Sequence, residues 1–457
     1  MKTGDSDDGR DCGKPSKQVR ETQHDHGQEE SLPIEPRDRW CWVERSVWTK
    51  RMLDTLERGV KGDKWYSLID KVYSPLNLRS ACERVARNRG AAGVDRQSIA
   101  QFNRHVDDHL AKLHDELKNG HYVPCDVLRR WIDKPGSKDK RPLGIPTVRD
   151  RVVQTAVRNV MEPIFEHRFH DRSFGFRPGR GCRDALREVD RLLKAGHTWV
   201  VDADIKGYFD SIPHNALLQR VEEQISDGRI LKLIGQFLKQ GIMDEMRRWV
   251  PEEGTPQGAV ISPLLSNIYL DPLDKQMSEH GYEMIRYADD FIILCRDEQQ
   301  AQHALAEVGQ WMEANKLQLH PEKTRLVDAT QRGGFDFLGY HFERGMKWPR
   351  KKSEKKLKDT IRRLTRRQNG TSLQSIITDI NPVLRGWFGY FKHSFWNVFP
   401  GIDGWIRMRL RSLLRKRLGG KGRGRGIDHQ RWPNAFFEQL GLYSTTKAHV
   451  RLANPMR

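Results

Sequence analysis

The chain has 457 residues, of which 31% are charged and 9% aromatic, and its formal net charge is +19. This length has room for about two to four domains with real cores, and no apolar run reaches the roughly 18 residues of a membrane-spanning helix. The six cysteines stand singly without a Cys-x-x-Cys pair, which excludes a zinc ribbon and a disulfide scaffold. We expect a soluble, cytoplasmic protein with no membrane partner.

The N-terminal segment is polar. Residues 1–39 contain few aromatic side chains and end in a proline-containing stretch, which is typical of a loosely attached leader. Helical periodicity follows, since Trp48, Met52 and Leu56 recur at helix spacing. We therefore predict a leader and N-terminal extension over residues 1–59; the sequence does not indicate the role of residues 1–39.

Two β-rich segments place acidic side chains in apolar surroundings. In residues 198–205, alternation puts Asp202 and Asp204 on the same strand face. In residues 282–295, Asp289 and Asp290 stand between apolar β-formers that must be buried. Taken alone, an Asp-Asp pair in a hairpin is most often turn chemistry.

Carboxylates held in such surroundings are costly unless a cation neutralises them. Oxygen ligands of this type favour Mg²⁺, and in-line nucleotidyl transfer uses two metal ions about 3.5 to 4 Å apart. The carboxylate pattern therefore indicates a site for two Mg²⁺ ions.

The positive charge lies almost entirely in the last quarter of the chain. Residues 346–457 contain 26 Lys and Arg against 6 Asp and Glu, whereas residues 1–345 contain 54 against 55. A cationic region joined to a neutral body is typical of a polyanion-binding module, although a merely solvated basic surface is the simpler alternative. We expect a helix over Lys347–Arg367, with Leu357, Ile361 and Leu364 on its packed face.

Several motifs resemble those of reverse transcriptases, and of group II intron-encoded enzymes in particular. Asp204-Ile-Lys-Gly-Tyr-Phe-Asp210 resembles the first palm motif and Tyr287-Ala-Asp-Asp290 the second. The resemblance implies that Asp204, Asp289 and the backbone carbonyl of Ile205 bind the metals, while Asp290 supports them. It also implies an α+β fold of the right-hand polymerase type, with fingers and an antiparallel palm sheet over residues 60–345 and an α-helical basic thumb or maturase region over 346–457.

Other residues match the family's nucleotide and primer contacts. Phe209 stands where the family places a ring that excludes a 2′-hydroxyl, although a simple core role is the alternative. Lys323 matches a lysine that could protonate pyrophosphate, or it is a solvated surface lysine. The resemblance assigns nucleotide binding to Lys134, Lys140, Arg141, Phe209, Gln257 and Lys323, without deciding which basic residue holds the triphosphate, and the primer grip to Phe337, Leu338 and Gly339.

The basic region is the candidate RNA-binding surface. Its segment from Asn381 to Ser394 interleaves aromatic rings with cations, although such rings more often form a core than a stacking platform. The segment resembles the maturase or thumb region of group II intron proteins. The candidate RNA contacts are Lys355, Lys356, Arg362, Arg363, Arg366, Arg367, Arg385 and Lys392.

The sequence thus predicts a group II intron-encoded RNA-directed DNA polymerase that also acts as a maturase. Its expected partners are group II intron RNA, a DNA primer or target and dNTPs, in a bacterial cytoplasm and at the nucleoid when bound to DNA. No cysteine and only His429 and His449 follow residue 400, so no metal-dependent nuclease domain is expected. The alternatives are a retron, diversity-generating or defence-associated reverse transcriptase, or a catalytically silent RNA-binding splicing factor. The oligomeric state stays open.

Overall fold

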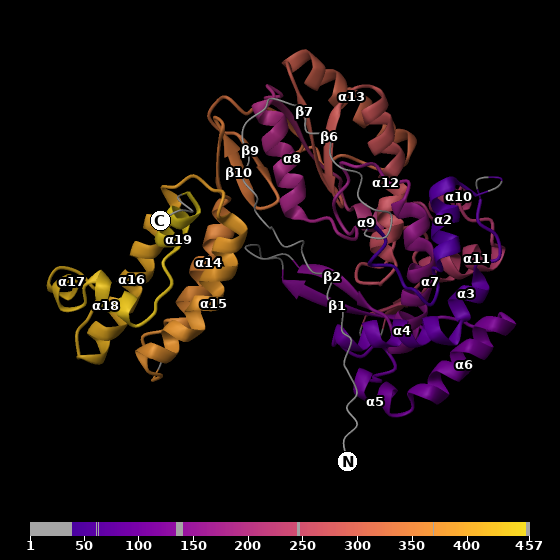
Figure 1. Cartoon of the computed structure of the whole chain (residues 1–457), viewed down its shortest axis with the longest axis horizontal. Helices are drawn as coiled ribbons and strands as arrows, with labels where there is room; N and C mark the ends of the chain where they lie inside the picture. Colours follow the sequence, from indigo (N-terminus) through magenta and orange to yellow (C-terminus); the bar gives the residue numbers. More distant parts are fainter. Residues whose placement is uncertain are drawn as a thin grey trace, which may run out of the picture.

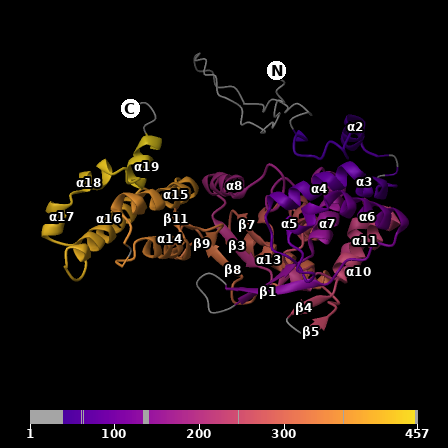
Figure 2. The ribbon, with the colours of Figure 1, turned by 90° about the horizontal axis from the view of Figure 1, so that it is seen from below.

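The computed structural model describes residues 39–60, 62, 64–133, 140–244, 247–368 and 370–453. The leader predicted over residues 1–39 therefore lies almost wholly outside the described residues, as does Lys134. Figures 1 and 2 show a large body of helices and sheets, with an all-helical lobe beside it that is joined through a small sheet.

A helical layer surrounds one long buried helix. Helix α7 (Val148–Glu166) is buried around nearly its whole circumference, which marks it as the central element of this part of the fold. Trp48 lies against it and donates its indole N–H to the carbonyl of Asn159, so the segment before residue 59 belongs to the same core. The other helices here are α2 (Lys50–Arg58), α3 (Ile69–Tyr73), α4 (Pro75–Arg87), α5 (Ile99–Arg104) and α6 (Val106–Asn119).

The centre of the body is a four-stranded antiparallel sheet in the order β6-β7-β3-β8. Its strands are β3 (Trp199–Asp204), β6 (Glu283–Tyr287), β7 (Asp290–Cys295) and β8 (Arg325–Asp328). The predicted alternation is confirmed, because Val201 and Ala203 pack into one core while Val200 packs into another across the sheet. The helices around it are α8 (Cys182–Lys194), α9 (Tyr208–Ser211), α10 (His214–Glu222), α11 (Gly228–Leu238), α12 (Ser262–Glu279) and α13 (Glu298–Ala314).

A second sheet, in the order β2-β1-β4-β5, projects beside the palm. Strands β1 (Val127–Asp133) and β2 (Lys140–Ile145) form a hairpin, and β1 runs parallel to β4 (Ile242–Asp244), which pairs with β5 (Arg247–Trp249). This sheet corresponds to the expected fingers.

A three-stranded sheet connects the body to the helical lobe. Its strands are β9 (Phe335–Phe337), β10 (Tyr340–Glu343) and β11 (Met346–Pro349). The helix expected over Lys347–Arg367 is therefore shorter than predicted: Lys347 lies in β11, and α14 begins at Lys351 and ends at Leu364. Leu357 and Ile361 are buried, as their spacing predicts.

The helical lobe has its own apolar core, formed by α14, α15 (Leu373–Phe391) and α16 (Val398–Arg417) with the shorter helices that follow. These are α17 (Ile427–Arg431), α18 (Asn434–Gln439) and α19 (Thr445–Ala453). Phe388 is buried and Trp387 is partly buried, so these rings serve the core, not a stacking platform. No helix in the described ranges is long and apolar enough to cross a bilayer. The domain boundaries at residues 59/60 and 345/346 remain a prediction.

Candidate functional site

The palm sheet brings the three predicted aspartates together. In the antiparallel register Asp204, the last residue of β3, lies directly opposite Asp290, the first residue of β7. Side chains at directly opposed positions have their Cβ atoms about 5 Å apart. Because Tyr287 pairs with Asp290, Ala288 and Asp289 form the two-residue turn of the β6–β7 hairpin, which puts Asp289 beside the other two carboxylates.

The acidic cluster carries mutual repulsion. Burial raises the pKa of Asp290 to about 7, and Asp202, Asp289 and Asp204 contribute in the same direction. Burial also raises the pKa of Asp289, with Asp204 adding to the shift, while Arg141 opposes it. A bound cation would remove this repulsion by favouring the charged form of both carboxyl groups.

The donor set fits a hard divalent cation that keeps open coordination positions. Among the described residues, no group of three or more His, Cys, Asp or Glu side chains is arranged as a ready metal site. Ions such as Mg²⁺ are commonly bound through one or two carboxylates plus water and substrate phosphate. The crowded Asp204 and Asp289 carboxylates therefore fit a divalent ion shared with the substrate.

A buried network fixes the backbone of the β6–β7 turn. Ala288 has φ +62°, a conformation that costs energy for a residue with a side chain and that needs support from its surroundings. The Arg286 guanidinium donates through Nη1 to the Ala288 carbonyl at 2.9 Å and to Asn267 Oδ1 at 2.8 Å. Its Nε lies 2.8 Å from Asp274 Oδ1, and both side chains are almost completely buried.

Sequence reasoning missed this network. Gly175 completes it: Asn267 donates to the Gly175 carbonyl at 2.8 Å, and a Cβ on Gly175 would lie 2.2 Å from the Ala288 nitrogen. The signal was an arginine inside an otherwise apolar strand, since a buried charge requires a paired partner. Asp274 could not be identified as that partner from spacing alone.

Two basic side chains flank the carboxylates from the β8 side. Lys323 Nζ lies 2.5 Å from Asp204 Oδ2, so this predicted nucleotide contact pairs with a predicted metal ligand. Arg325 pairs with Asp202, with Nη2 at 3.0 Å from Oδ2. Asp202 is thus paired with an arginine, whereas Asp204 is paired with a lysine whose side chain is 58% exposed.

The loop at residues 254–258 joins the palm to the fingers. The Thr255 amide donates to the Phe209 carbonyl at 2.6 Å, and the Gly144 amide donates to the Gln257 carbonyl at 2.6 Å. A Cβ on Gly258 would lie 2.4 Å from the Gly144 carbonyl oxygen, so the approach requires glycine. Gln257 and the half-buried Phe209 are thereby held on neighbouring parts of the palm.

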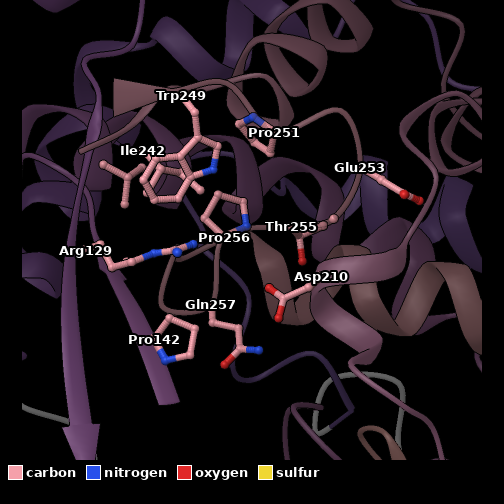
Figure 3. A pocket seen from close by; sticks show the side chains of 13 residues that line it. Arg129, Pro142, Asp210, Ile242, Trp249, Pro251, Glu253, Thr255, Pro256 and Gln257 are labelled. Carbon is pink, nitrogen blue, oxygen red and sulfur yellow. The ribbon is translucent and has the colours of Figure 1, made fainter. Parts of the chain in front are cut away.

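A pocket of about 360 Å³ lies between this loop and the fingers sheet (Figure 3). Gln257 and Pro142 line one side, and Arg129 crosses it with its guanidinium 4.4 Å from the Trp249 ring centroid. Thr255 is buried, and its hydroxyl has no hydrogen-bond partner within the described structure. The pocket therefore combines flat apolar walls with polar groups able to bind a ligand.

The predicted fingers cations lie at the start of β2. Lys140 and Arg141 are both exposed, and Arg141 is close enough to lower the pKa of Asp289. Arg141 is therefore the described fingers cation whose charge reaches the acidic cluster. The guanidinium is suited to bind a phosphate near the metal site.

The predicted primer grip forms a strained two-residue turn. Leu338 and Gly339 connect β9 to β10, with φ values of +46° and +83°. The Tyr390 hydroxyl of α15 donates to the Leu338 carbonyl at 2.7 Å, and the Ser353 hydroxyl of α14 donates to the Gly339 carbonyl at 3.2 Å. Phe337 is buried in the core, so the exposed part of the grip is the turn itself.

The candidate RNA contacts have different local surroundings. Lys355, Lys356 and Arg363 line a groove of about 580 Å³ that also includes Gly339, so they lie beside the primer-grip turn. Arg362 pairs with Asp359 on its own helix, with 2.5 Å between Nη1 and Oδ1. Arg366 and Arg367 are exposed beyond the end of α14, Arg385 lies 5.4 Å from the Tyr443 ring, and Lys392 is half-buried.

These elements define a right-hand polymerase. The chain combines a fingers sheet, an antiparallel palm sheet with an acidic hairpin turn, a small sheet with the Leu338–Gly339 turn and a basic helical lobe. Comparison with known proteins makes the class specific. Residues 132–342 match the model of reverse transcriptase, an RNA-dependent DNA polymerase, and residues 354–432 match the maturase-specific domain of group II introns.

Similar proteins agree with this assignment. Protein YkfC of Escherichia coli K12 is 34% identical over 318 residues, which cover 61% of this chain and 83% of YkfC. Group II intron-encoded protein LtrA of Lactococcus lactis is 44% identical over 197 residues, 43% of this chain and 32% of LtrA. An uncharacterised 91 kDa protein in the cob intron of Schizosaccharomyces pombe is 43% identical over 168 residues, 37% of this chain and 21% of that protein. The chain belongs to the group II intron-encoded reverse transcriptase and maturase family.

Proposed function

We propose that the protein copies RNA into DNA by two-metal nucleotidyl transfer at the β6–β7 turn, and that its helical lobe binds intron RNA and assists splicing. The observation that carries the catalytic part is the register of the palm sheet. It places Asp204 directly opposite Asp290 and puts Asp289 in the connecting turn. A scaffold that only bound RNA would gain nothing from three crowded carboxylates with a raised pKa at Asp290.

Asp204, Asp289 and the Ile205 carbonyl would hold the Mg²⁺ ions. When bound, the metal activates the primer 3′-oxygen and stabilises the charge on the leaving pyrophosphate. The Asp290 carboxylate supports its two neighbours from the opposing strand. The protein's own contribution is a rigid turn, since the Arg286 bonds to Ala288 and Asn267 fix the backbone on which Asp289 sits.

The surrounding side chains position the remaining groups. Arg141 binds the triphosphate of the incoming dNTP, because its charge already reaches Asp289. Phe209 limits the space at the sugar and so favours deoxynucleotides. Lys323, whose ammonium group lies 2.5 Å from Asp204 Oδ2, would donate a proton to the leaving pyrophosphate. The Leu338–Gly339 turn holds the primer end.

The RNA-binding part rests on the match to the maturase-specific domain and on the excess of cations in residues 346–457. Lys355, Lys356 and Arg363 adjoin the primer-grip turn, so we propose that they contact the primer–template duplex as well as intron RNA. Each phosphate contact releases counterions, which makes such binding depend on salt.

Primer extension with the variant Asp289→Ala tests the catalytic proposal. This variant should give no Mg²⁺-dependent cDNA on a primed RNA template, while Asp115→Ala, which removes an exposed carboxylate on α6, should extend normally. Circular dichroism would verify that both variants are folded. Near-normal extension by Asp289→Ala would overturn the metal assignment.

A further inference from the structure

A second groove lies at the far end of the small sheet from the primer-grip turn. Strand β10 begins beside Gly339 and ends at Glu343, where the Arg344–Gly345 turn leads into β11. At that end, α8, the β10–β11 turn and the C-terminal end of α15 enclose a groove of about 1010 Å³. We name it the junction groove, and the lining residues that matter here are Lys194, Arg344, Lys347, His393, Phe395 and Trp396.

The junction groove is separate from the polymerase cleft. It shares no lining residue with the groove around Gly339 that adjoins the primer grip. The four residues of β10 span about 13 Å at the usual rise of a strand. The junction groove and the groove beside the primer-grip turn therefore open at opposite ends of β10.

The groove presents a fixed aromatic ring to solvent. Trp396 is 61% exposed, although indole is among the side chains that gain most from burial. Phe395 lies behind it, with 5.7 Å between ring centroids, and Trp348 lies 5.9 Å from Phe395. The Phe395 amide donates to the Lys347 carbonyl at 2.8 Å, which anchors this aromatic segment to β11. The exposed indole is therefore held by neighbouring rings and by a backbone hydrogen bond.

Two exposed cations line the same groove as this ring. Lys194 and Arg344 are exposed, and neither forms an ion pair with a carboxylate among the described residues. The two acidic residues of the groove are already engaged: Asp190 pairs with Lys347, and Glu343 accepts from the Gly333 amide. The groove therefore offers an exposed ring and two exposed cations to an anionic ligand, although Arg344 also interacts electrostatically with the neighbouring Glu343.

We propose that the junction groove binds an unpaired nucleic-acid strand, with one base stacked on Trp396 and the adjoining phosphates on Lys194 and Arg344. Bases are free to stack on a protein ring only where the strand is single, and aromatic rings beside cations are the usual means of binding it. RNA is the expected source, because the maturase-specific domain spans the adjoining helices. This choice of RNA over DNA is the only point that rests on the proposed function.

Fluorescence anisotropy with a labelled single-stranded RNA of about 12 nucleotides tests the inference, since comparable sites bind roughly 4 to 16. The polymerase cleft would first be saturated with unlabelled primer–template duplex. Trp396→Ala should weaken RNA binding about 5- to 100-fold, which is the effect of losing one base–ring stack. Trp396→Phe should keep most of the wild-type affinity, because the phenyl ring can still stack. Lys194→Gln with Arg344→Gln should flatten the logarithmic salt slope, whereas Lys112→Gln, on the exposed face of α6, should not.

Three outcomes would overturn the inference. Unchanged RNA affinity in Trp396→Ala would remove the stacking role. Equal affinity for a DNA strand of the same sequence would refute RNA as the source. A shift from dimer to monomer in Trp396→Ala during sedimentation, with RNA binding intact, would assign the groove to a second copy of the chain. Primer extension by Trp396→Ala should equal that of the wild type. If the wild-type protein itself extends no primer, that result refutes the proposed polymerase function and leaves the groove inference standing.

Discussion

Removing Arg286 should both destabilise the palm and disable the catalytic turn. The variant Arg286→Met leaves the Asp274 carboxylate buried without its partner, since Asp274 has a side chain only 3% exposed. Breaking a buried pair from one side costs about 3 to 5 kcal/mol. Burial already raises the pKa of Asp274, so the carboxyl group should take up a proton in this variant and keep the cost near the lower end of that range.

The double variant Arg286→Met with Asp274→Leu separates stability from positioning. Replacing a whole buried pair by apolar side chains is often close to neutral, so the part of the lost stability that came from the unpaired Asp274 carboxylate should return. The Ala288 carbonyl and Asn267 Oδ1 still lack their donor, however, at about 1 to 3 kcal/mol each. The rate of primer extension by the double variant should therefore remain about 100-fold below that of the wild type if the turn shifts by roughly 1 Å.

Urea denaturation and single-turnover primer extension at saturating Mg²⁺ measure the two effects. Arg191→Met is the matched control, because Arg191 is 56% exposed and pairs with Glu188 on the surface of α8. Such a pair is worth about 0 to 1 kcal/mol. The reasoning is refuted if Arg286→Met unfolds within about 1 kcal/mol of the wild type, or if the double variant extends primers normally.

Three further predictions concern the sugar, the charged lobe and the acidic cluster. Phe209→Ala should incorporate ribonucleotides more readily, and unchanged discrimination in single-nucleotide incorporation would return Phe209 to a core role. Without metal, the protein should lose up to about 4 kcal/mol of stability as pH rises from about 4 to 7. Over that range the unfolded chain releases the Asp290 proton that the folded state retains, because the folded pKa is about 7. Asp290→Asn or added Mg²⁺ should flatten this slope in pH-dependent unfolding, and a flat wild-type profile would contradict it. Asp289→Ala should still promote splicing. A variant with six basic residues of the helical lobe changed to Gln should bind intron RNA more weakly, and its logarithmic salt slope should fall by about 0.7 to 0.9 per lost phosphate contact. Wild-type affinity and slope in this variant would exclude an RNA-anchoring role for these residues. The residues changed to Gln in that variant are Lys355, Lys356, Arg362, Arg363, Arg366 and Arg367.

The sequence predicted the palm well because its signals were local. Alternation in residues 198–205 correctly placed Asp202 and Asp204 on one face, and the resemblance placed Asp289 in a hairpin. The network behind that hairpin was not predictable, because Arg286 meets Asp274 and Asn267 only after α12 packs on the sheet. Helix spacing alone gives no sign of such a contact.

The start of the helical lobe was predicted less well. A run of lysines and arginines favours a helix from Lys347 onward, yet Lys347 pairs with Phe342 in the small sheet. Strand pairing is a long-range effect, and it overrode local helix propensity. The same sheet separates the junction groove from the primer grip, a division that charge patterning could not show.

The Leu338–Gly339 turn is bonded to both helices that begin the lobe, through Tyr390 of α15 and Ser353 of α14. A displacement of these helices would therefore be transmitted to the turn that we propose as the primer grip. RNA bound to the helical lobe would therefore change the position of the primer 3′ end relative to Asp204 and Asp289. The chain alone and the chain on its RNA should thus differ in processivity, although their carboxylates are identical.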